Sequence, residues 1–155
     1  MLRLVCLLAA VFATSAACAG SLTRLPANPV AIANAQSEGM VLIDIRTPAE
    51  WEQTGLTPGA VPLQFFDAQG NYDAAAFMQS VEAMAGKDTP IGIICRTANR
   101  SGPVAEFMAQ QGWDVTDYQG GIVALGYHDY QPVSLQQALS DLENTAYCST
   151  PLAAC

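Results

Sequence analysis

One segment in the middle of the chain combines a nucleophile with positive charge: its sequence is Cys95-Arg96-Thr97-Ala98-Asn99-Arg100-Ser101. The thiolate is the reactive form of cysteine, and an ordinary thiol contains only a few per cent of it at neutral pH. Arg96 and Arg100 favour the thiolate, and they are two of only five Lys and Arg residues beyond residue 20. This local positive charge in an acidic chain predicts nucleophilic chemistry by Cys95 on a small anionic substrate.

The elements around this segment predict where the cysteine lies. Residues 90–95 form an apolar run typical of a buried strand, and residues 101–111 have the apolar spacing of a helix. Further strands are expected at 40–45, 60–63 and 115–118, and further helices at 30–37, 47–53, 74–85, 122–125 and 134–144. Strands separated by helices build a parallel sheet covered on both faces, so we expect an α/β domain. Ligands bind at the carboxyl ends of such strands, and this is where Cys95 is expected, beside a helix N-terminus.

Four segments have spacing that resembles a known family: residues 42–51, 55–60, 95–101 and 118–122. They resemble, in order, the first strand and D-x-R signature, the G-H-I-P-G-A segment, the C-R-x-G-x-R-S loop and the double glycine of the rhodanese sulfurtransferases. Two positions depart from this pattern, since Leu56 stands where the family often has histidine and Ala98 where it often has glycine. Glycine suits a positive φ that alanine resists at a cost of about 1 kcal/mol, so Ala98 bears on the loop geometry.

The resemblance implies a three-layer rhodanese-like fold over residues 27–130 and a transfer of sulfane sulfur. Cys95 is then expected to attack the outer sulfur of thiosulfate or a similar anionic donor and to carry that sulfur as a persulfide. A thiol, a protein or cyanide would accept it. Loop amides and arginines would stabilise the charges that develop. The expected substrate-binding residues are Arg96, Thr97, Ala98, Asn99, Arg100 and Ser101.

Asp44 lies within the predicted strand at 40–45 and Arg46 directly follows it, and two interpretations of these residues stay open. Either they position the cysteine loop from behind, or Arg46 simply pairs with Glu50, which lies four positions on in a short helix.

Other functions fit parts of the same pattern. A sulfur-carrier, binding or sensing module of this family would keep the fold without turnover. In tyrosine phosphatases and some arsenate reductases, five residues separate the cysteine from an arginine. Only four residues separate Cys95 from Arg100. The shorter loop favours a pocket of the size of a sulfur atom over one of the size of a phosphate. A thiol redox protein would need Cys95 to exchange with Cys148 or Cys155.

Residues 1–19 have the pattern of a secretory leader, with Arg3, an apolar run at 4–13 and small residues after it. Cleavage after Ala19 is one prediction. Cleavage after Ala17 is the alternative, and it would make Cys18 the lipidated residue of an anchored bacterial lipoprotein. Either way we expect export to the periplasm or cell envelope of a bacterium.

Residues 131–155 form a tail with a predicted helix and two cysteines, Cys148 and Cys155. Export places them in an oxidising compartment, where a disulfide between them would close a loop of about eight residues. Two free thiols are the alternative. Cys95 is left as the odd, reactive thiol.

The composition excludes several other functions. The formal net charge is −8, which argues against binding nucleic acid, and beyond the leader no apolar run is long enough for a transmembrane helix. The only histidine, His128, has no companion for a metal site, and no glycine-rich nucleotide motif occurs. We therefore expect no metal and no cofactor. We also expect a monomer.

Overall fold

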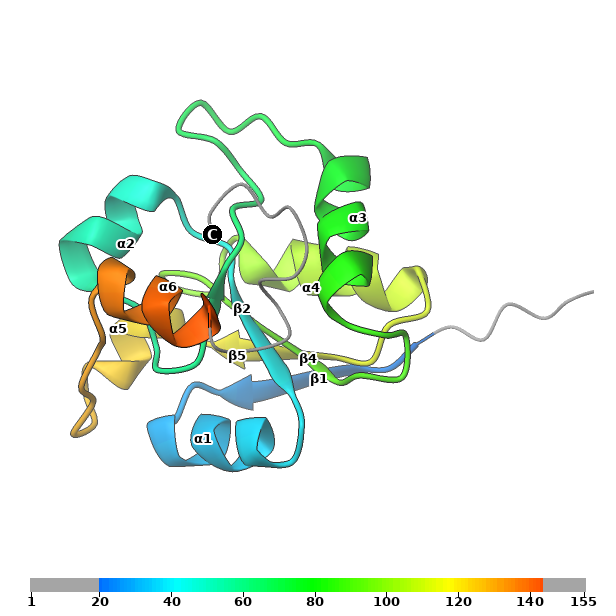
Figure 1. The fold of residues 1–155 in the computed structure, drawn as a ribbon. Coiled ribbons are helices and arrows are strands. Elements are labelled where there is room, and N and C mark those ends of the chain that lie inside the picture. Colours follow the sequence, from blue (N-terminus) through cyan, green and yellow to red (C-terminus); the bar gives the residue numbers. More distant parts are fainter. Residues whose placement is uncertain (1–19, 144–155) are drawn as a thin grey trace, which may run out of the picture.

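The computed structural model describes residues 20–143 (Figure 1). Its elements, in chain order, are β1 (Leu22–Pro26), α1 (Pro29–Ser37), β2 (Val41–Asp44), α2 (Pro48–Thr54), β3 (Val61–Pro62), α3 (Ala74–Met84), β4 (Ile91–Ile94), α4 (Ser101–Gln110), β5 (Val115–Gln119), α5 (Gly121–Leu125) and α6 (Leu135–Glu143). The predicted leader with Cys18, and the tail cysteines Cys148 and Cys155, lie outside the described residues. In the part that the structure describes, no helix has the length and apolar character needed to cross a membrane.

The sheet has five parallel strands in the order β1-β5-β4-β2-β3. β4 lies between β5 and β2, at the centre of the sheet. Its register pairs Ile94 with Asp44 of β2, so these two strands end level with one another. Cys95 is the next residue of the chain, and it therefore lies at the carboxyl edge of the sheet, as predicted.

Helices cover both faces of the sheet, which makes three layers (Figure 1). α3 and α4 pack on one face, where Ile43 and Ile93 meet Val81 and Met108. α1 and α5 cover the other face, where the core contains Ile32, Leu42, Ile94, Tyr118 and Leu125. The predicted α/β class with a covered parallel sheet is confirmed.

Local capping explains where three helices begin. The side chain of Asn28 accepts hydrogen bonds from the first amides of α1, and that of Asp73 accepts from Ala76 in α3. Thr47 and Glu50 form the predicted capping box at the start of α2. Each cap acts within a few residues, and the corresponding helices were predicted to within one or two residues.

β1 is a strand that the sequence did not predict. It pairs in parallel with β5, from Leu22 opposite Val115 to Pro26 opposite Gln119, and forms one edge of the sheet. Four of its five side chains are exposed, so the segment has no apolar pattern of its own. Its backbone pairing with β5 makes it a strand.

The predicted tail helix forms as α6 and packs beside α2. Ala138 joins Trp51 and Leu56 in a small apolar cluster. Leu56 also exchanges backbone hydrogen bonds with Val133, at N–O distances of 2.9 and 3.0 Å. The leucine that replaces the common histidine of the motif is fully buried, and here it attaches the tail to the domain.

Candidate functional site

Cys95 lies at the turn between β4 and α4. Its exposed fraction is 1%. The loop of residues 96–100 exposes Arg96, Thr97 and Asn99, while Arg100 and Ala98 are half-buried. The seven residues that the sequence analysis singled out thus surround the end of the central strand, with the N-terminus of α4 directly behind them.

Ala98 has a φ of 72° and is the one non-glycine residue with positive φ among residues 20–143. This is the left-handed conformation that a glycine would adopt without strain. The carbonyl oxygen of Ala98 accepts a hydrogen bond from the amide of Gly102 at 3.1 Å, within the first turn of α4. Ala98 therefore adopts the left-handed conformation expected of the glycine in this motif, and the resulting backbone strain costs about 1 kcal/mol of stability.

The double glycine before α5 holds the other side of the loop. The amide of Ile122 donates to the carbonyl oxygen of Cys95 at 3.0 Å, and the amide of Val123 donates to the carbonyl oxygen of Arg96 at 3.1 Å. A Cβ atom on Gly121 would lie 2.3 Å from the Cys95 carbonyl oxygen, so a side chain has no room there. α5 and the cysteine loop are in direct backbone contact.

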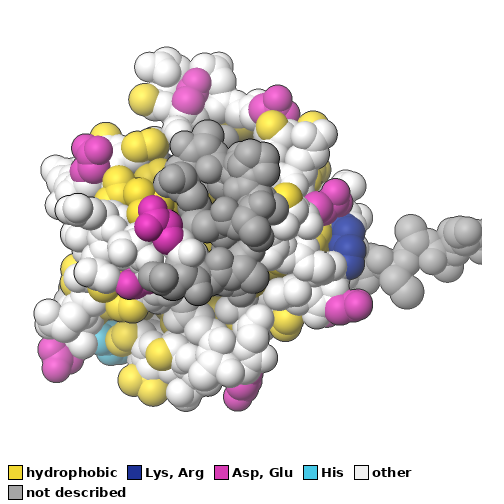
Figure 2. Space-filling view, in the orientation of Figure 1, with side chains coloured by type: hydrophobic (Ala, Val, Ile, Leu, Met, Phe, Trp, Pro, Cys, Tyr) yellow, Lys and Arg dark blue, Asp and Glu magenta, His cyan; other side chains and the backbone are white. Residues whose placement is uncertain are grey.

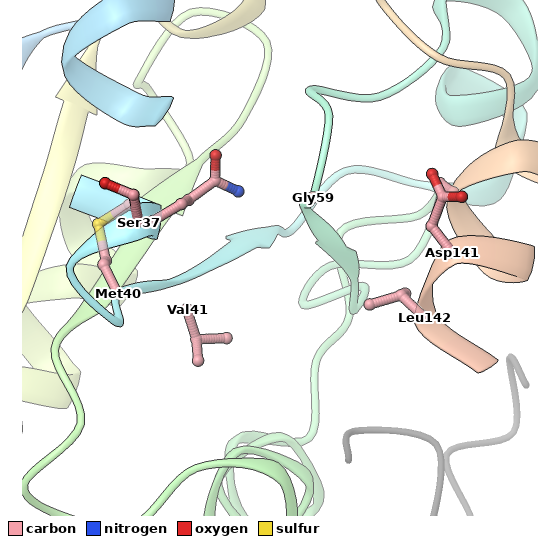
Figure 3. A pocket seen from close by; sticks show the side chains of 8 residues that line it. Ser37, Met40, Val41, Gly59, Asp141 and Leu142 are labelled. Atoms are coloured by element: carbon pink, nitrogen blue, oxygen red, sulfur yellow. The ribbon is translucent and has the colours of Figure 1, made fainter. Parts of the chain in front are cut away.

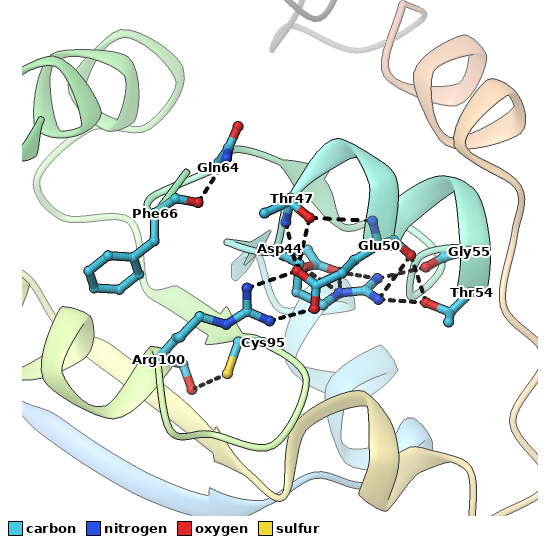
Figure 4. A network of polar contacts seen from close by, with 11 residues as sticks. Asp44, Thr47, Glu50, Thr54, Gly55, Gln64, Phe66, Cys95 and Arg100 are labelled. Carbon is cyan, nitrogen blue, oxygen red and sulfur yellow. Dashed lines mark hydrogen bonds and ion pairs between the residues drawn. The ribbon is translucent and has the colours of Figure 1, made fainter. Parts of the chain in front are cut away.

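Arg100 forms a two-pronged ion pair with Glu50 of α2, with N–O distances of 2.8 and 2.6 Å (Figure 4). The hydrogen bond from Arg100 lowers the pKa of Glu50 to about 2. The same bond raises the pKa of Arg100, and Cys95 adds to that rise. Arg100 therefore interacts with both the Glu50 carboxylate and the Cys95 sulfur, and the interaction with Glu50 is the stronger of the two.

Arg46 does not pair with Glu50, the partner that the spacing of four residues suggested. Its Nε and Nη2 atoms donate to the carboxylate of Asp44 at 2.8 to 3.0 Å, and both side chains are buried. Nη1 and Nη2 also reach Thr54 and the carbonyl oxygen of Gly55, at the end of α2. The interpretation of an Arg46–Glu50 ion pair is wrong, because the Glu50 carboxylate is bound to Arg100. Asp44 and Arg46 instead attach α2 to β2, and α2 carries Glu50.

Asp117 is a residue near Cys95 that sequence reasoning missed. It lies on β5, fully buried, and accepts a hydrogen bond from the Ser101 hydroxyl at 2.6 Å. Ser101 Oγ in turn lies 3.5 Å from Cys95 Sγ. Burial raises the pKa of Asp117. A charged residue inside a predicted core strand was the signal that could have identified it.

Arg96 opens onto a pocket of about 300 Å³ beside the loop, lined also by residues of α2 and by Ile122 and Val123 of α5. Cys95 does not line this pocket. On the face seen in Figure 2, Asp and Glu side chains are widely scattered, and a single patch of Lys or Arg is visible, at one edge. A second pocket, of about 390 Å³, lies at the amino end of β2 between Met40 and Leu142 (Figure 3), and none of the predicted site residues lines it.

Comparison with known proteins agrees with this geometry. Residues 29–126 match the family model described as the rhodanese-like domain. The chain belongs to this family. The rhodanese-like match runs from α1 through α5 and includes Asp44, Arg46 and the whole cysteine loop.

Individual relatives are similar over the same region. A sulfurtransferase of Allochromatium vinosum is 34% identical over 95 residues, covering 61% of this chain and 78% of the relative. A rhodanese domain-containing protein of Drosophila melanogaster is 34% identical over 83 residues, covering 51% and 75%. The crystal structure of a rhodanese-related protein from Thermoplasma volcanium has a TM-score of 0.53 at 19% identity, covering 70% of this chain and 96% of that one. That of a rhodanese-like domain protein from Staphylococcus aureus has a TM-score of 0.52 at 19% identity, covering 72% and 99%.

Proposed function

We propose that this protein is a sulfurtransferase that carries a sulfane sulfur as a persulfide on Cys95. The observation that carries the proposal is the position of Cys95: it ends the central parallel strand, beneath a loop with two arginines and before a helix N-terminus. The similarity to a sulfurtransferase of Allochromatium vinosum supports the same reaction class.

The reaction has two half-reactions. The Cys95 thiolate attacks the outer sulfur of thiosulfate or a similar donor, the sulfur–sulfur bond of the donor breaks, and sulfite leaves with the bonding electron pair. A nucleophile, either a thiol or cyanide, then attacks the outer sulfur of the persulfide and releases the Cys95 thiolate. The positive charge near the sulfur stabilises the anions on both sides of each step.

The two arginines have different surroundings and, in this proposal, different roles. Arg96 is exposed at the mouth of the neighbouring pocket, and within residues 20–143 no ion pair is recorded for it. It is suited to bind the oxyanion of the donor. Arg100 is bound to Glu50, so its role is to shape the loop and to place a cation beside the sulfur.

The predicted leader places this reaction in the periplasm or cell envelope, and this location is part of the proposal. It rests on residues 1–19 as a sequence pattern. The mass of the protein recovered from its native envelope tests it, since cleavage after Ala17 with lipidation of Cys18 and cleavage after Ala19 leave different masses.

Intact mass spectrometry tests the sulfur transfer. The purified protein is treated with thiosulfate beside a Cys95→Ala variant, and cyanide is then added. The proposal predicts a gain of one sulfur atom in the wild type that cyanide removes, and no gain in the variant. If the wild type gains no sulfur while its fold is intact, the carrier is not Cys95 and a binding or sensing role replaces the proposal.

A further inference from the structure

The carboxylate of Asp117 is buried beneath the cysteine loop at the end of a chain of three side chains. Ser101 Oγ lies 2.6 Å from Asp117 Oδ1 and 3.5 Å from Cys95 Sγ. Asp117 lies on β5, Ser101 is the first residue of α4, and Cys95 directly follows β4. All three are buried. The loop arginines lie outside this chain of contacts.

The direction of these hydrogen bonds follows from proton counting. A serine hydroxyl has one proton to donate, and an ionised carboxylate can only accept. While Asp117 is ionised, the short contact therefore requires Ser101 to donate its proton to Asp117. Ser101 Oγ is then left with lone pairs toward Cys95, where it can accept from a thiol but offers nothing to a thiolate.

We propose that Asp117 is a positioning residue that acts through Ser101, turning the hydroxyl so that it accepts the Cys95 S–H and keeps the proton on the sulfur until a donor engages. The inference rests on the proposed function of Cys95 as the sulfur carrier. Asp117 then favours the thiol form of Cys95, whereas the arginines of the loop favour the thiolate. The reactivity of Cys95 depends on which of these effects is larger.

The groups around Asp117 act on its pKa in both directions. Gln119 donates to its second oxygen, and the charge of Arg24 on β1 also favours ionisation. Burial and the negative charge of Glu106 on α4 act in the opposite direction, and burial is the largest cause of the raised pKa of Asp117. On the cysteine side, Arg100 is the cation that interacts with Cys95.

The pH dependence of alkylation at Cys95 tests this inference without any sulfur donor. Full-length protein is treated with iodoacetamide across a pH series, and the rate at the Cys95 peptide is measured by mass spectrometry. In Asp117→Asn the side-chain amide can donate to Ser101 and free its hydroxyl for the thiolate. We expect the midpoint of the rate profile to move down by about one pH unit, which is about tenfold faster alkylation below both midpoints, with an unchanged plateau at high pH.

A matched control is Asp114→Asn, an exposed aspartate just before β5 that bonds to the Ser21 amide. It removes the same charge and is expected to leave the midpoint at the wild-type pH. Equal midpoints in wild type and Asp117→Asn would overturn the inference, as would an upward shift.

A double-mutant cycle tests whether Asp117 acts through Ser101. In a Ser101→Ala background, the Asp117→Asn shift should shrink to less than a third of its size. A shift of the same size in both backgrounds would mean that Asp117 acts by charge through space, which overturns the inference. If Asp117→Asn does not fold, Ser101→Ala alone decides, because the loss of the thiol's acceptor should also lower the midpoint. Failure of the persulfide experiment would leave these shifts measurable, so the two proposals fail separately.

Discussion

Glu50 and Arg100 are fifty residues apart in the chain and form a two-pronged ion pair across the front of the cysteine loop. Glu50 also closes the capping box of α2 through Thr47, so one carboxylate both starts a helix and holds the loop. Arg46 and Asp44 attach the far end of α2 to β2. The position of Arg100 beside Cys95 thus depends on a path of contacts through α2.

Removing this anchor should impair sulfur transfer. Glu50→Gln keeps the size of the side chain but releases Arg100 from its fixed position beside the sulfur, and small displacements of reacting groups cost large factors in rate. We expect kcat/KM for thiosulfate-to-cyanide transfer to fall about tenfold. Glu52→Gln, an exposed neighbour on the same helix, is the control. Identical kinetics in the two variants would contradict the role given to the ion pair.

The same ion pair should make stability fall in acid. The pKa of Glu50 is lowered from its ordinary 4.5 to about 2, so its ionised form stabilises the fold. This contribution is present above pH 4.5 and is lost as the pH falls toward 2. Urea unfolding of wild type and Glu50→Gln over this range measures it. We expect the difference in unfolding free energy to shrink as the pH falls, and a constant difference would contradict the assignment.

Asp117 should have the opposite effect on stability. Burial raises its pKa above the ordinary 3.8, so ionisation costs free energy in the folded state. Stability should therefore decrease as the pH rises from 3.8 through the raised value. Asp117→Asn removes this dependence. The unfolding free energy of the variant should therefore increase relative to that of the wild type as the pH rises through this range. A stability gap between the two proteins that stays flat with pH would count against the raised pKa.

Ala98 offers a test of backbone strain. Because its φ is 72°, Ala98→Gly should raise the unfolding free energy by about 1 kcal/mol. Ala33→Gly, at an exposed position in the middle of α1, should lower it by about 1 kcal/mol. Denaturant melts of both variants give the comparison. Destabilisation by both substitutions would show that the loop does not take the left-handed bend.

The buried ion pair between Arg46 and Asp44 should contribute more to stability than an exposed ion pair does. Arg46→Met leaves the buried Asp44 without its partner, and such a loss costs about 3 kcal/mol or more. Arg24→Met, which breaks the exposed ion pair to Glu106, should cost less than about 1 kcal/mol. Thermal or urea unfolding measures both. Similar losses for the two variants would contradict the importance assigned to the buried pair.

Much of the architecture is readable in the sequence because its signals are local. Asn28, Thr47 and Asp73 cap their helices within three residues of themselves, and apolar runs mark the buried strands β2 and β4. The position of Cys95 at the end of β4 follows from such a run. The loop and the family were therefore predictable from four short segments, residues 42–51, 55–60, 95–101 and 118–122.

Tertiary structure decided what depends on partners distant in the chain. β1 has no apolar pattern and becomes a strand because β5 pairs with it. The Glu50 carboxylate binds Arg100, fifty residues away in the loop after β4, and Arg46 therefore pairs with Asp44 instead of Glu50. Asp117 is sixteen residues from Ser101, and only the parallel pairing of β5 with β4 and the packing of α4 on the sheet bring it beneath the cysteine. Caps and strands follow from neighbours in sequence, whereas ion pairs and buried hydrogen bonds require the packed sheet, whose geometry determines which of several competing partners lies within reach.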